Sequence, residues 1–247
     1  MYKIVFIRHG QSEWNASGRF TGWTDVALTD QGRDEAKKAG ELLKDYLFDL
    51  AITSILKRNT ETLDIILSEL NLDISTENYW RLNERHYGAL QGLNKIETVK
   101  EYGKDQVFQW RRGYDVKPPL LTENDPRHSS LDPLYKNIPK EYLPRGESLE
   151  DTEKRVMVCW DKNIAPEIKL GKNIILVGHG NSLRALIKNL DNISKEDISS
   201  LDIPTGIPLV YELDEDLRPI KSYYLGDQEE IKKRTKEVKN QIEYSDK

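Results

Sequence analysis

The sequence predicts an α/β protein, a three-layer sandwich whose mostly parallel central sheet carries helices on both faces and is interrupted by a loop-rich insertion. Two observations predict this fold class. Short continuous apolar runs alternate along the chain with longer segments in which apolar residues recur at helical spacing. Between about residues 87 and 145 this alternation stops and six prolines occur, which predicts the insertion.

The expected strands are short and mainly apolar, and the continuous apolar runs of the first and third are typical of strands buried on both faces. They cover residues 4–7, 50–52, 173–177 and 208–213. The first run stops at Arg8-His9-Gly10 and the third at Gly178-His179-Gly180, so we expect both strands to end in loops at these points.

The expected helices follow from their start signals and their spacing. Thr29 is the expected N-cap of the first helix, a second helix starts near Leu56, and a fourth covers residues 183–190. The third begins at Ser148, where Asp151 gives a start like a capping box. The apolar residues that recur along the first helix are Ala36, Ala39, Leu43 and Leu47.

These elements fit one domain over residues 1–226 that includes the insertion at about 87–145, and a loop region of that length is usually functional. Residues 227–247 are polar and lack an apolar periodicity strong enough for a docked helix, so we expect a mobile C-terminal tail. Because the tail contains a basic cluster, we also hypothesise that it becomes ordered over an anion held in a pocket and excludes water there.

Composition excludes several classes of partner. The 247 residues carry a formal net charge of −5, which gives no overall attraction to nucleic acid or to an anionic membrane. Residues 3–7 are too few for a signal peptide's apolar region or a membrane span. The single cysteine, Cys159, excludes a disulfide framework and suits a reducing compartment. We therefore expect a cytoplasmic protein that holds any anionic substrate with a local basic cluster.

Two histidines occupy matching positions, because His9 and His179 each follow an apolar run and lie beside a glycine. Ligands bind at the carboxyl ends of strands in an open parallel sheet, so the two side chains can face one crevice. A single histidine in this position would more often cap its strand by bonding a neighbouring carbonyl. Two of them, with Arg8 beside the first, favour chemistry.

Several cationic side chains are suited to phosphate. Arg8 adjoins His9, and Arg58 is expected in the first turn of its helix, where backbone N–H groups also attract anions. Lys95 and the pair Arg111-Arg112 lie in the insertion. Each alone is more often a solvated surface charge, and spacing does not show whether they converge.

Glu84 is the candidate acid, since a carboxylic acid buried among apolar walls can exchange a proton near neutral pH. The alternative is a surface ion pair with Arg85 or Arg81. A metal site is not expected, because the sequence has no cysteine pair and no His-Glu-x-x-His. A nucleotide site is not expected either, because no P-loop or dinucleotide glycine motif follows the first strand.

An ordered set of motifs adds to these single residues. In chain order the motifs are Arg8-His9-Gly10 with Ser12 and Trp14-Asn15, Phe20-Thr21-Gly22-Trp23, Ser54-Ile55-Leu56-Lys57-Arg58, Leu82-Asn83-Glu84-Arg85-His86-Tyr87-Gly88, Gly92-Leu93-Asn94-Lys95, Trp110-Arg111-Arg112, Glu147-Ser148-Leu149, Gly178-His179-Gly180-Asn181-Ser182 and Ile203-Pro204-Thr205-Gly206-Ile207-Pro208. Over nearly the whole chain this set resembles the cofactor-dependent phosphoglycerate mutases of the histidine phosphatase superfamily. Two departures, Asn59 and Gly113, fall at positions with no expected catalytic role.

The resemblance implies roles for the site residues. His9 would be the nucleophile that carries the phosphoryl group, and Glu84 would be the general acid and base for the substrate hydroxyl. His179 and Arg8 would hold the transferring phosphoryl group, with Arg58 beside them. The residues that would line the site and bind substrate phosphate and carboxylate are Asn15, Thr21, Gly22, Arg58, Tyr87, Lys95, Arg111, Arg112, Gly180 and Asn181.

The resemblance also implies an activity, the interconversion of 3-phosphoglycerate and 2-phosphoglycerate in glycolysis and gluconeogenesis. The phosphohistidine would be primed by 2,3-bisphosphoglycerate, without a metal. The expected partners are small anionic phosphoglycerates, with no nucleic acid and no membrane, and a homo-oligomer, either a dimer or a tetramer, is left open. Two alternatives remain: a phosphatase or bisphosphoglycerate mutase or synthase that uses the same site, and a non-catalytic phosphoprotein-binding module, which would not need His9.

Overall fold

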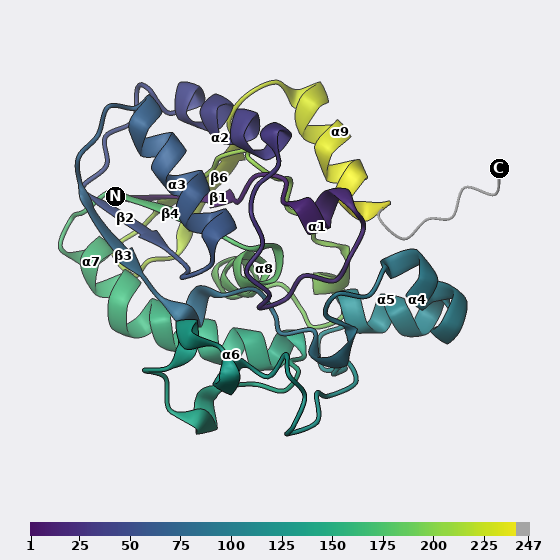
Figure 1. The fold of residues 1–247 in the computed structure, drawn as a ribbon. Helices are drawn as coiled ribbons and strands as arrows, with labels where there is room; N and C mark the ends of the chain where they lie inside the picture. Colours follow the sequence, from purple (N-terminus) through teal and green to yellow (C-terminus); the bar gives the residue numbers. More distant parts are fainter. Residues whose placement is uncertain (241–247) are drawn as a thin grey trace.

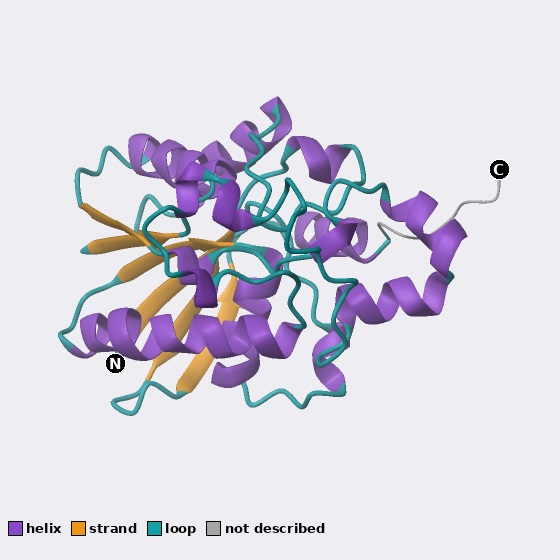
Figure 2. Cartoon of the chain, turned by 60° about the horizontal axis from the view of Figure 1, so that its bottom comes forward, coloured by secondary structure: helices purple, strands orange, loops and turns teal. Residues whose placement is uncertain are grey.

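Six strands form one central sheet with helices on both faces in the computed structural model, which describes residues 1–240 (Figures 1 and 2). The strands are β1 (Tyr2–Arg8), β2 (Leu50–Thr53), β3 (Ser75–Asn78), β4 (Ile174–Gly178), β5 (Leu209–Leu213) and β6 (Pro219–Tyr224). Their order is β3-β2-β4-β1-β5-β6. The first four run parallel, and β5 runs antiparallel to both of its neighbours. The predicted three-layer sandwich with a mostly parallel sheet is confirmed.

The helices form two layers around the sheet, with additional helices at the carboxyl ends of the parallel strands (Figure 1). The α-helices are α1 (Glu13–Ala16), α2 (Asp30–Leu42), α3 (Lys57–Glu69), α4 (Lys95–Tyr102), α5 (Lys104–Arg112), α6 (Leu149–Cys159), α7 (Ala165–Lys169), α8 (Gly180–Leu190) and α9 (Gln228–Lys239). A π-helical turn, Trp160–Ile164, joins α6 to α7. Short 3₁₀ turns cover Trp80–Leu82, Gly88–Leu90, Ser129–Leu131, Pro133–Tyr135, Lys140–Tyr142 and Asp197–Ser200.

The middle of strand β1, residues 4–7, is apolar because both of its faces are buried there. Side chains alternate between the two faces of a strand, so Ile4 and Phe6 join the core cluster that contains α6 and α8, whereas Val5 and Ile7 join the cluster that contains α2 and α3. Cys159 is buried in the first cluster, as a packing residue. The two cores fix β1 from both sides and therefore fix the loop that follows it.

The predicted helix starts are confirmed at their caps. The Thr29 side chain accepts a hydrogen bond from the Gly32 backbone, and Ser148 forms a capping box with Asp151. Two boundaries need correction. α2 ends at Leu42, so Leu47 is not part of its apolar face and is exposed. α8 begins at Gly180 rather than near residue 183, directly after His179, because His179 itself takes the N-cap position.

The insertion contains two helices that the sequence did not predict. α4 begins after Asn94, whose side chain accepts from the backbone N–H groups of Ile96 and Glu97. α5 follows after Gly103, whose φ of 83° lies in the left-handed region that glycine tolerates. After residue 112 the insertion is loop-rich, as predicted, with only 3₁₀ turns up to α6. Figure 1 shows α4 and α5 to one side of the sheet.

The predicted tail needs correction for residues 228–239, which form α9 beside α2. Asp227 caps the helix by accepting from the Glu230 backbone. Ile231 and Val238 are buried, and their separation of two helical turns is an apolar periodicity too sparse to stand out in a polar segment. The rest of the predicted tail, residues 241–247, lies outside the described residues.

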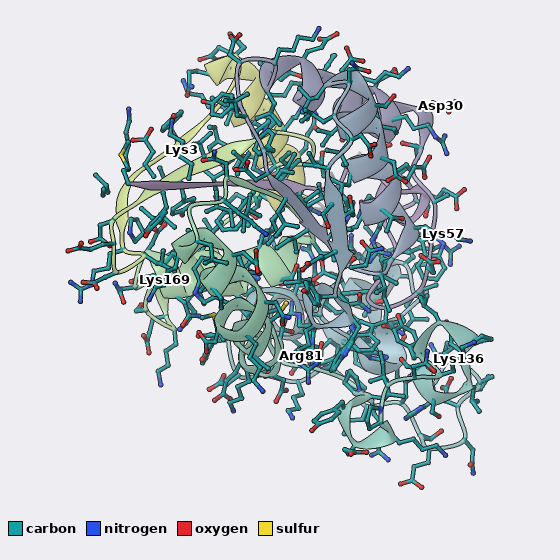
Figure 3. All side chains as sticks on the ribbon, turned by 90° about the vertical axis from the view of Figure 1, so that its left-hand side faces the viewer. Lys3, Asp30, Lys57, Arg81, Lys136 and Lys169 are labelled. Carbon is teal, nitrogen blue, oxygen red and sulfur yellow. The ribbon has the colours of Figure 1, made fainter. Side chains whose placement is uncertain are left out.

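Charged side chains cover the outside of the molecule in Figure 3, among them Lys57 at the start of α3 and Lys136 in the insertion. Over residues 1–240, none of the helices is both long enough and apolar enough to cross a membrane.

Candidate active site

Two adjacent parallel strands bring His9 and His179 together. β1 and β4 pair with Arg8 opposite Gly178, so the histidine that follows each strand lies at the same end of the sheet. The ring centroids of His9 and His179 are 5.1 Å apart, and the rings meet edge to face. The structure thus places the two histidines side by side, as their matching positions in the sequence predicted.

His9 is held in one tautomer. Its Nδ1 lies 2.7 Å from the carbonyl oxygen of Gly10. A carbonyl can only accept, so Nδ1 carries the proton and Nε2 keeps its lone pair. Burial, with the nearby charges of Arg58 and Arg8, holds the pKa of His9 well below its usual value. The side chain is therefore a neutral imidazole whose Nε2 can act as a nucleophile.

His179 is fully buried beneath the start of α8. Its Nε2 lies 2.8 Å from Oγ of Ser54, the residue that follows β2. Burial, with the nearby side chains of Arg58 and His9, holds the pKa of His179 well below its usual value. The sequence contained Ser54 as the first residue of a recognised motif, but spacing alone did not show that it contacts His179.

Arg8 and Arg58 are buried cations beside the histidines. Arg8 donates from Nη1 to the carbonyl of Ile203 at 2.8 Å, and its Nε has no hydrogen-bond partner among the described residues. Arg58 donates to the carbonyl oxygens of Gly22 at 2.8 Å and Thr24 at 3.0 Å. Burial lowers the pKa of Arg58 to about 10, which leaves it charged at neutral pH. Because these partners are carbonyls, the two charges are left to attract an anion.

Glu84 lies in the pocket and not on the surface, so the alternative of a surface ion pair is wrong. Its Oε1 accepts from the backbone N–H of Arg85 at 2.7 Å and of Asn181 at 3.1 Å. The Glu84 carbonyl in turn accepts from Trp23 Nε1 at 2.6 Å and from Arg155 at 3.1 Å. Both ends of the residue are therefore fixed, which is the arrangement that a proton-transferring acid requires.

The insertion supplies a second group of cations. Lys95 is the first residue of α4, and Arg111 and Arg112 are the last two residues of α5. All three are at least nine-tenths buried. Burial, with Arg111 and other cations nearby, holds the pKa of Lys95 well below its usual value, and burial lowers the pKa of Arg111 to about 10. Arg112 forms a buried ion pair with Asp202.

One pocket gathers nearly all of the residues predicted from the sequence. The predicted residues that line it are Arg8, His9, Asn15, Thr21, Gly22, Arg58, Glu84, Tyr87, Lys95, Arg111, Arg112, Gly180 and Asn181. His179 does not line the pocket but lies against His9. Gly22 has a φ of 56°, and a Cβ there would meet the Gln91 side chain at 2.1 Å, so only glycine fits.

Sequence reasoning missed five residues of the lining. They are Arg19, Phe20, Arg184, Ile203 and Val238. Phe20 and Ile203 each begin a recognised motif but were given no role, and Arg19 adjoins the first of these motifs. Arg184 lies one helical turn after Asn181, a spacing that could have signalled a shared face. Val238 belongs to α9, whose docking was not predicted.

The lining has a strong excess of positive charge. Its cations are Arg8, Arg19, Arg58, Lys95, Arg111, Arg112 and Arg184, and its carboxylate is Glu84. In the part of the chain that the structure describes, no group of three or more histidine, cysteine or acidic residues could hold a metal ion. The donor set instead fits a ligand with several anionic groups, and the unpartnered Nε of Arg8 is one donor available to it.

Comparison with known proteins identifies the family. The model of the histidine phosphatase superfamily, branch 1, matches residues 4–128 and 122–225. The chain belongs to this superfamily. A 2,3-bisphosphoglycerate-dependent phosphoglycerate mutase of Borreliella afzelii is 59% identical over 244 residues, which cover 98% of each chain. Another with the same name from Borreliella burgdorferi has the same identity and coverage.

Solved structures of two phosphatases share the fold. A mycobacterial glucosyl-3-phosphoglycerate phosphatase superposes with a TM-score of 0.69 at 22% identity, over 91% of this chain and 97% of that one. An α-ribazole phosphatase from Shigella flexneri superposes with a TM-score of 0.63 at 22% identity, over 89% and 94% of the two chains. At this identity the likeness shows the fold alone.

Proposed function

We propose that this chain is a 2,3-bisphosphoglycerate-dependent phosphoglycerate mutase, which interconverts 3-phosphoglycerate and 2-phosphoglycerate. The observation that carries the proposal is the 59% identity, over 98% of both chains, to relatives with this name. The pocket supports it, because a neutral histidine, a fixed carboxylate and a surplus of cations surround one space.

His9 acts as the phosphoryl carrier in this proposal. When 2,3-bisphosphoglycerate is bound, it supplies the phosphoryl group that primes the enzyme. Phospho-His9 then gives that group to the free hydroxyl of a phosphoglycerate, so the N–P bond breaks and an O–P bond forms. Glu84 takes the hydroxyl proton. Nε2 of His9 next attacks the other phosphoryl group, and Glu84 returns the proton to the departing oxygen, which yields the isomeric product.

The cations stabilise charge that would otherwise oppose the transfer. Arg8, Arg58 and His179 surround His9, so we assign to them the equatorial oxygens of the transferring phosphoryl group. Lys95, Arg111 and Arg112 lie in the insertion side of the pocket, and we assign to them the substrate's remaining phosphate and carboxylate. Asn15, Thr21, Gly22, Tyr87, Gly180 and Asn181 complete the binding surface.

The nearest alternative is a phosphatase that uses the same site. Two observations favour the mutase: the full-length relatives carry that name, and the insertion brings three cations to the pocket that would retain a reaction intermediate. A non-catalytic binding module is disfavoured, because a binder does not require His9 to be held neutral with Nε2 unprotonated.

We further propose that the reaction needs no metal and takes place in the cytoplasm. Activity should then survive EDTA, and vanadate should inhibit by resembling the transferring phosphoryl group. The oligomeric state is left open by the proposal, and light scattering coupled to size exclusion would distinguish a monomer, a dimer and a tetramer.

A coupled mutase assay with and without 2,3-bisphosphoglycerate tests the proposed function. We expect turnover that depends on this primer. Labelled 2,3-bisphosphoglycerate should also give an acid-labile, base-stable adduct that disappears in His9→Ala. Turnover that is independent of the primer, or an adduct that persists in His9→Ala, would contradict the proposal.

A further inference from the structure

Arg184 is a buried cation whose hydrogen bonds all go to neutral groups. It lies on α8 one turn after Asn181 and is 3% exposed. Nη1 donates to Oδ1 of Asn181 at 2.9 Å, and Nη2 donates to the carbonyl oxygens of Ile198 at 2.6 Å and Arg112 at 3.2 Å. Among the described residues its Nε has no hydrogen-bond partner, and the nearby carboxylate, Asp202, forms its ion pair with Arg112. Burying an unpaired charge is costly, so this guanidinium needs an explanation beyond packing.

The first consequence of its position concerns Asn181. A carboxamide can be turned either way in a pocket of its own shape, with oxygen and nitrogen exchanged. Arginine only donates, so Arg184 forces the Asn181 oxygen toward itself and the Nδ2 group toward the Tyr87 hydroxyl, 3.2 Å away. The side chain therefore presents N–H donors to a pocket that binds anions.

The second consequence concerns the end of α5. The last carbonyl groups of a helix have no partner within the helix and carry its negative dipole end. Arg184 donates a hydrogen bond to the carbonyl oxygen of Arg112, and Arg85 donates one to the carbonyl oxygen of Arg111. Arg111 and Arg112, whose side chains line the pocket, are thus held at their backbones by residues outside the insertion.

We propose that Arg184 is a positioning residue for phosphoglycerate binding, which acts through the Asn181 carboxamide and through the α5 end that carries Arg112. The inference rests on the proposed function and adds a role to it. Arg184 joins α8, which follows β4 of the central sheet, to α5 of the insertion. This contact fixes the distance between the two sides of the pocket.

Calorimetric binding of 3-phosphoglycerate to the unphosphorylated protein tests this inference, together with KM and kcat of the mutase reaction. Arg184→Met should raise the Kd and the KM by about 10- to 100-fold, the scale of a lost hydrogen bond to a charged group, while kcat changes less. Arg184→Lys keeps the charge but not the planar fork, so it should recover only part of the affinity.

A double-mutant cycle with Asn181→Ala separates positioning from direct contact. If Arg184 acts through Asn181, the double variant should bind about as weakly as the weaker single variant, because the second change removes nothing new. The control is Leu190→Ala at the far end of α8, which should lower the Tm and leave the Kd unchanged.

Two results would overturn the inference: folded Arg184→Met or Arg184→Lys protein with the wild-type Kd, or effects that multiply in the double variant. A failure of the proposed function has a different appearance. In that case the wild-type protein would lack primer-dependent turnover or fail to bind 3-phosphoglycerate, and both proposals would fall together.

Discussion

His9, Arg8 and His179 are positioned by the pairing of β1 with β4, whereas Lys95, Arg111 and Arg112 are positioned by two short helices of the insertion. We call these sets the strand-end half and the insertion half of the pocket. In the strand-end half the backbone is fixed by the sheet and by a core on either face. In the insertion half, hydrogen bonds from Arg85 and Arg184 hold the last carbonyls of α5.

The difference suggests that the strand-end half carries out the chemistry and that the insertion half binds the substrate. Chemistry requires reacting atoms to be held closely, and the sheet provides such a frame. Binding of phosphate and carboxylate requires less exact positions, so a short helix held by a few hydrogen bonds from charged side chains is sufficient. Changes in the strand-end half, and in Glu84 beside it, should therefore lower kcat most, whereas changes in the insertion half should raise KM.

The largest effect should come from Glu84→Gln. The amide keeps the shape of the side chain, and its oxygen can still accept from the backbone N–H groups of Arg85 and Asn181. Proton transfer is lost, so kcat should fall by about 10²–10⁴-fold with little change in KM, and priming of His9 should slow as well. Stopped assays of turnover and of the labelled phosphoenzyme measure both. An unchanged kcat would show that Glu84 is not the acid.

A smaller and different effect should come from Arg111→Met. Removal of one charge-assisted hydrogen bond should raise the KM for 3-phosphoglycerate by about 10- to 100-fold, with a lesser effect on kcat than Glu84→Gln. Lys136→Met is the matched control, because it removes the same charge from an exposed position of the same insertion (Figure 3). If Arg111→Met lowers kcat and spares KM, the proposed division between the halves is wrong.

The same contrast explains what the sequence predicts well. β1 and β4 each contain a continuous apolar run because both faces are buried there, and a histidine follows each strand directly. β3, with the sequence Ser-Thr-Glu-Asn, was missed because it lies at the edge of the sheet and is mostly exposed. α4, α5 and α9 were missed because each buries few apolar side chains, which leaves a weak apolar periodicity.

For the site, the motifs identified residues whose side-chain type alone indicates a chemical role, such as His9 as a nucleophile and Glu84 as an acid. They did not show which residues hold others in place, even for Ser54, which begins a motif. Ser54 and Arg184 make their contacts with residues far away in the sequence, at His179 and at the end of α5, and no local pattern encodes those distances.

Lower pH should reduce the stability of the folded protein, because His9, His86 and His179 are buried. Burial is the main cause that lowers the pKa of His9, His86 and His179, for His86 to about 3. Below pH 6.5 these histidines bind protons in the unfolded chain but stay neutral in the folded protein. The free energy of unfolding should therefore fall with pH, by up to about 1.4 kcal/mol per pH unit for each histidine, until the folded pKa is reached.

Urea unfolding at pH 7, 6 and 5 measures this dependence. His86→Asn should remove the contribution of one histidine, because the asparagine Oδ1 can take the place of Nδ1 and accept from the Gly88 backbone but does not titrate. If the variant and the wild-type protein lose stability in parallel between pH 7 and 5, then His86 is not buried in its neutral form.

The smallest expected effect concerns α9, which closes the pocket from outside both halves. Val238 lines the pocket, and Arg234 donates to the Thr205 carbonyl at 3.1 Å and lies 3.5 Å from Glu35. Glu35 in turn accepts from the backbone N–H of Gln11 at 2.9 Å, two residues after His9. The helix therefore lines the pocket through Val238 and is linked through Glu35 to the loop that follows β1.

Truncation after Asp227 removes these contacts but leaves the two halves of the pocket in place. His9 should still accept a phosphoryl group, because its tautomer is set by Gly10. Water should reach phospho-His9 more easily, so the phosphoenzyme should hydrolyse several times faster and mutase turnover should fall. Arg234→Met should act in the same direction but more weakly, and Lys232→Met, at an exposed position of α9, should have no effect. Labelled phosphoenzyme decay, followed beside the coupled assay, distinguishes the outcomes. If the truncated protein keeps both its turnover and its phosphoenzyme half-life, then α9 plays no part in excluding water, and the two halves alone must do so.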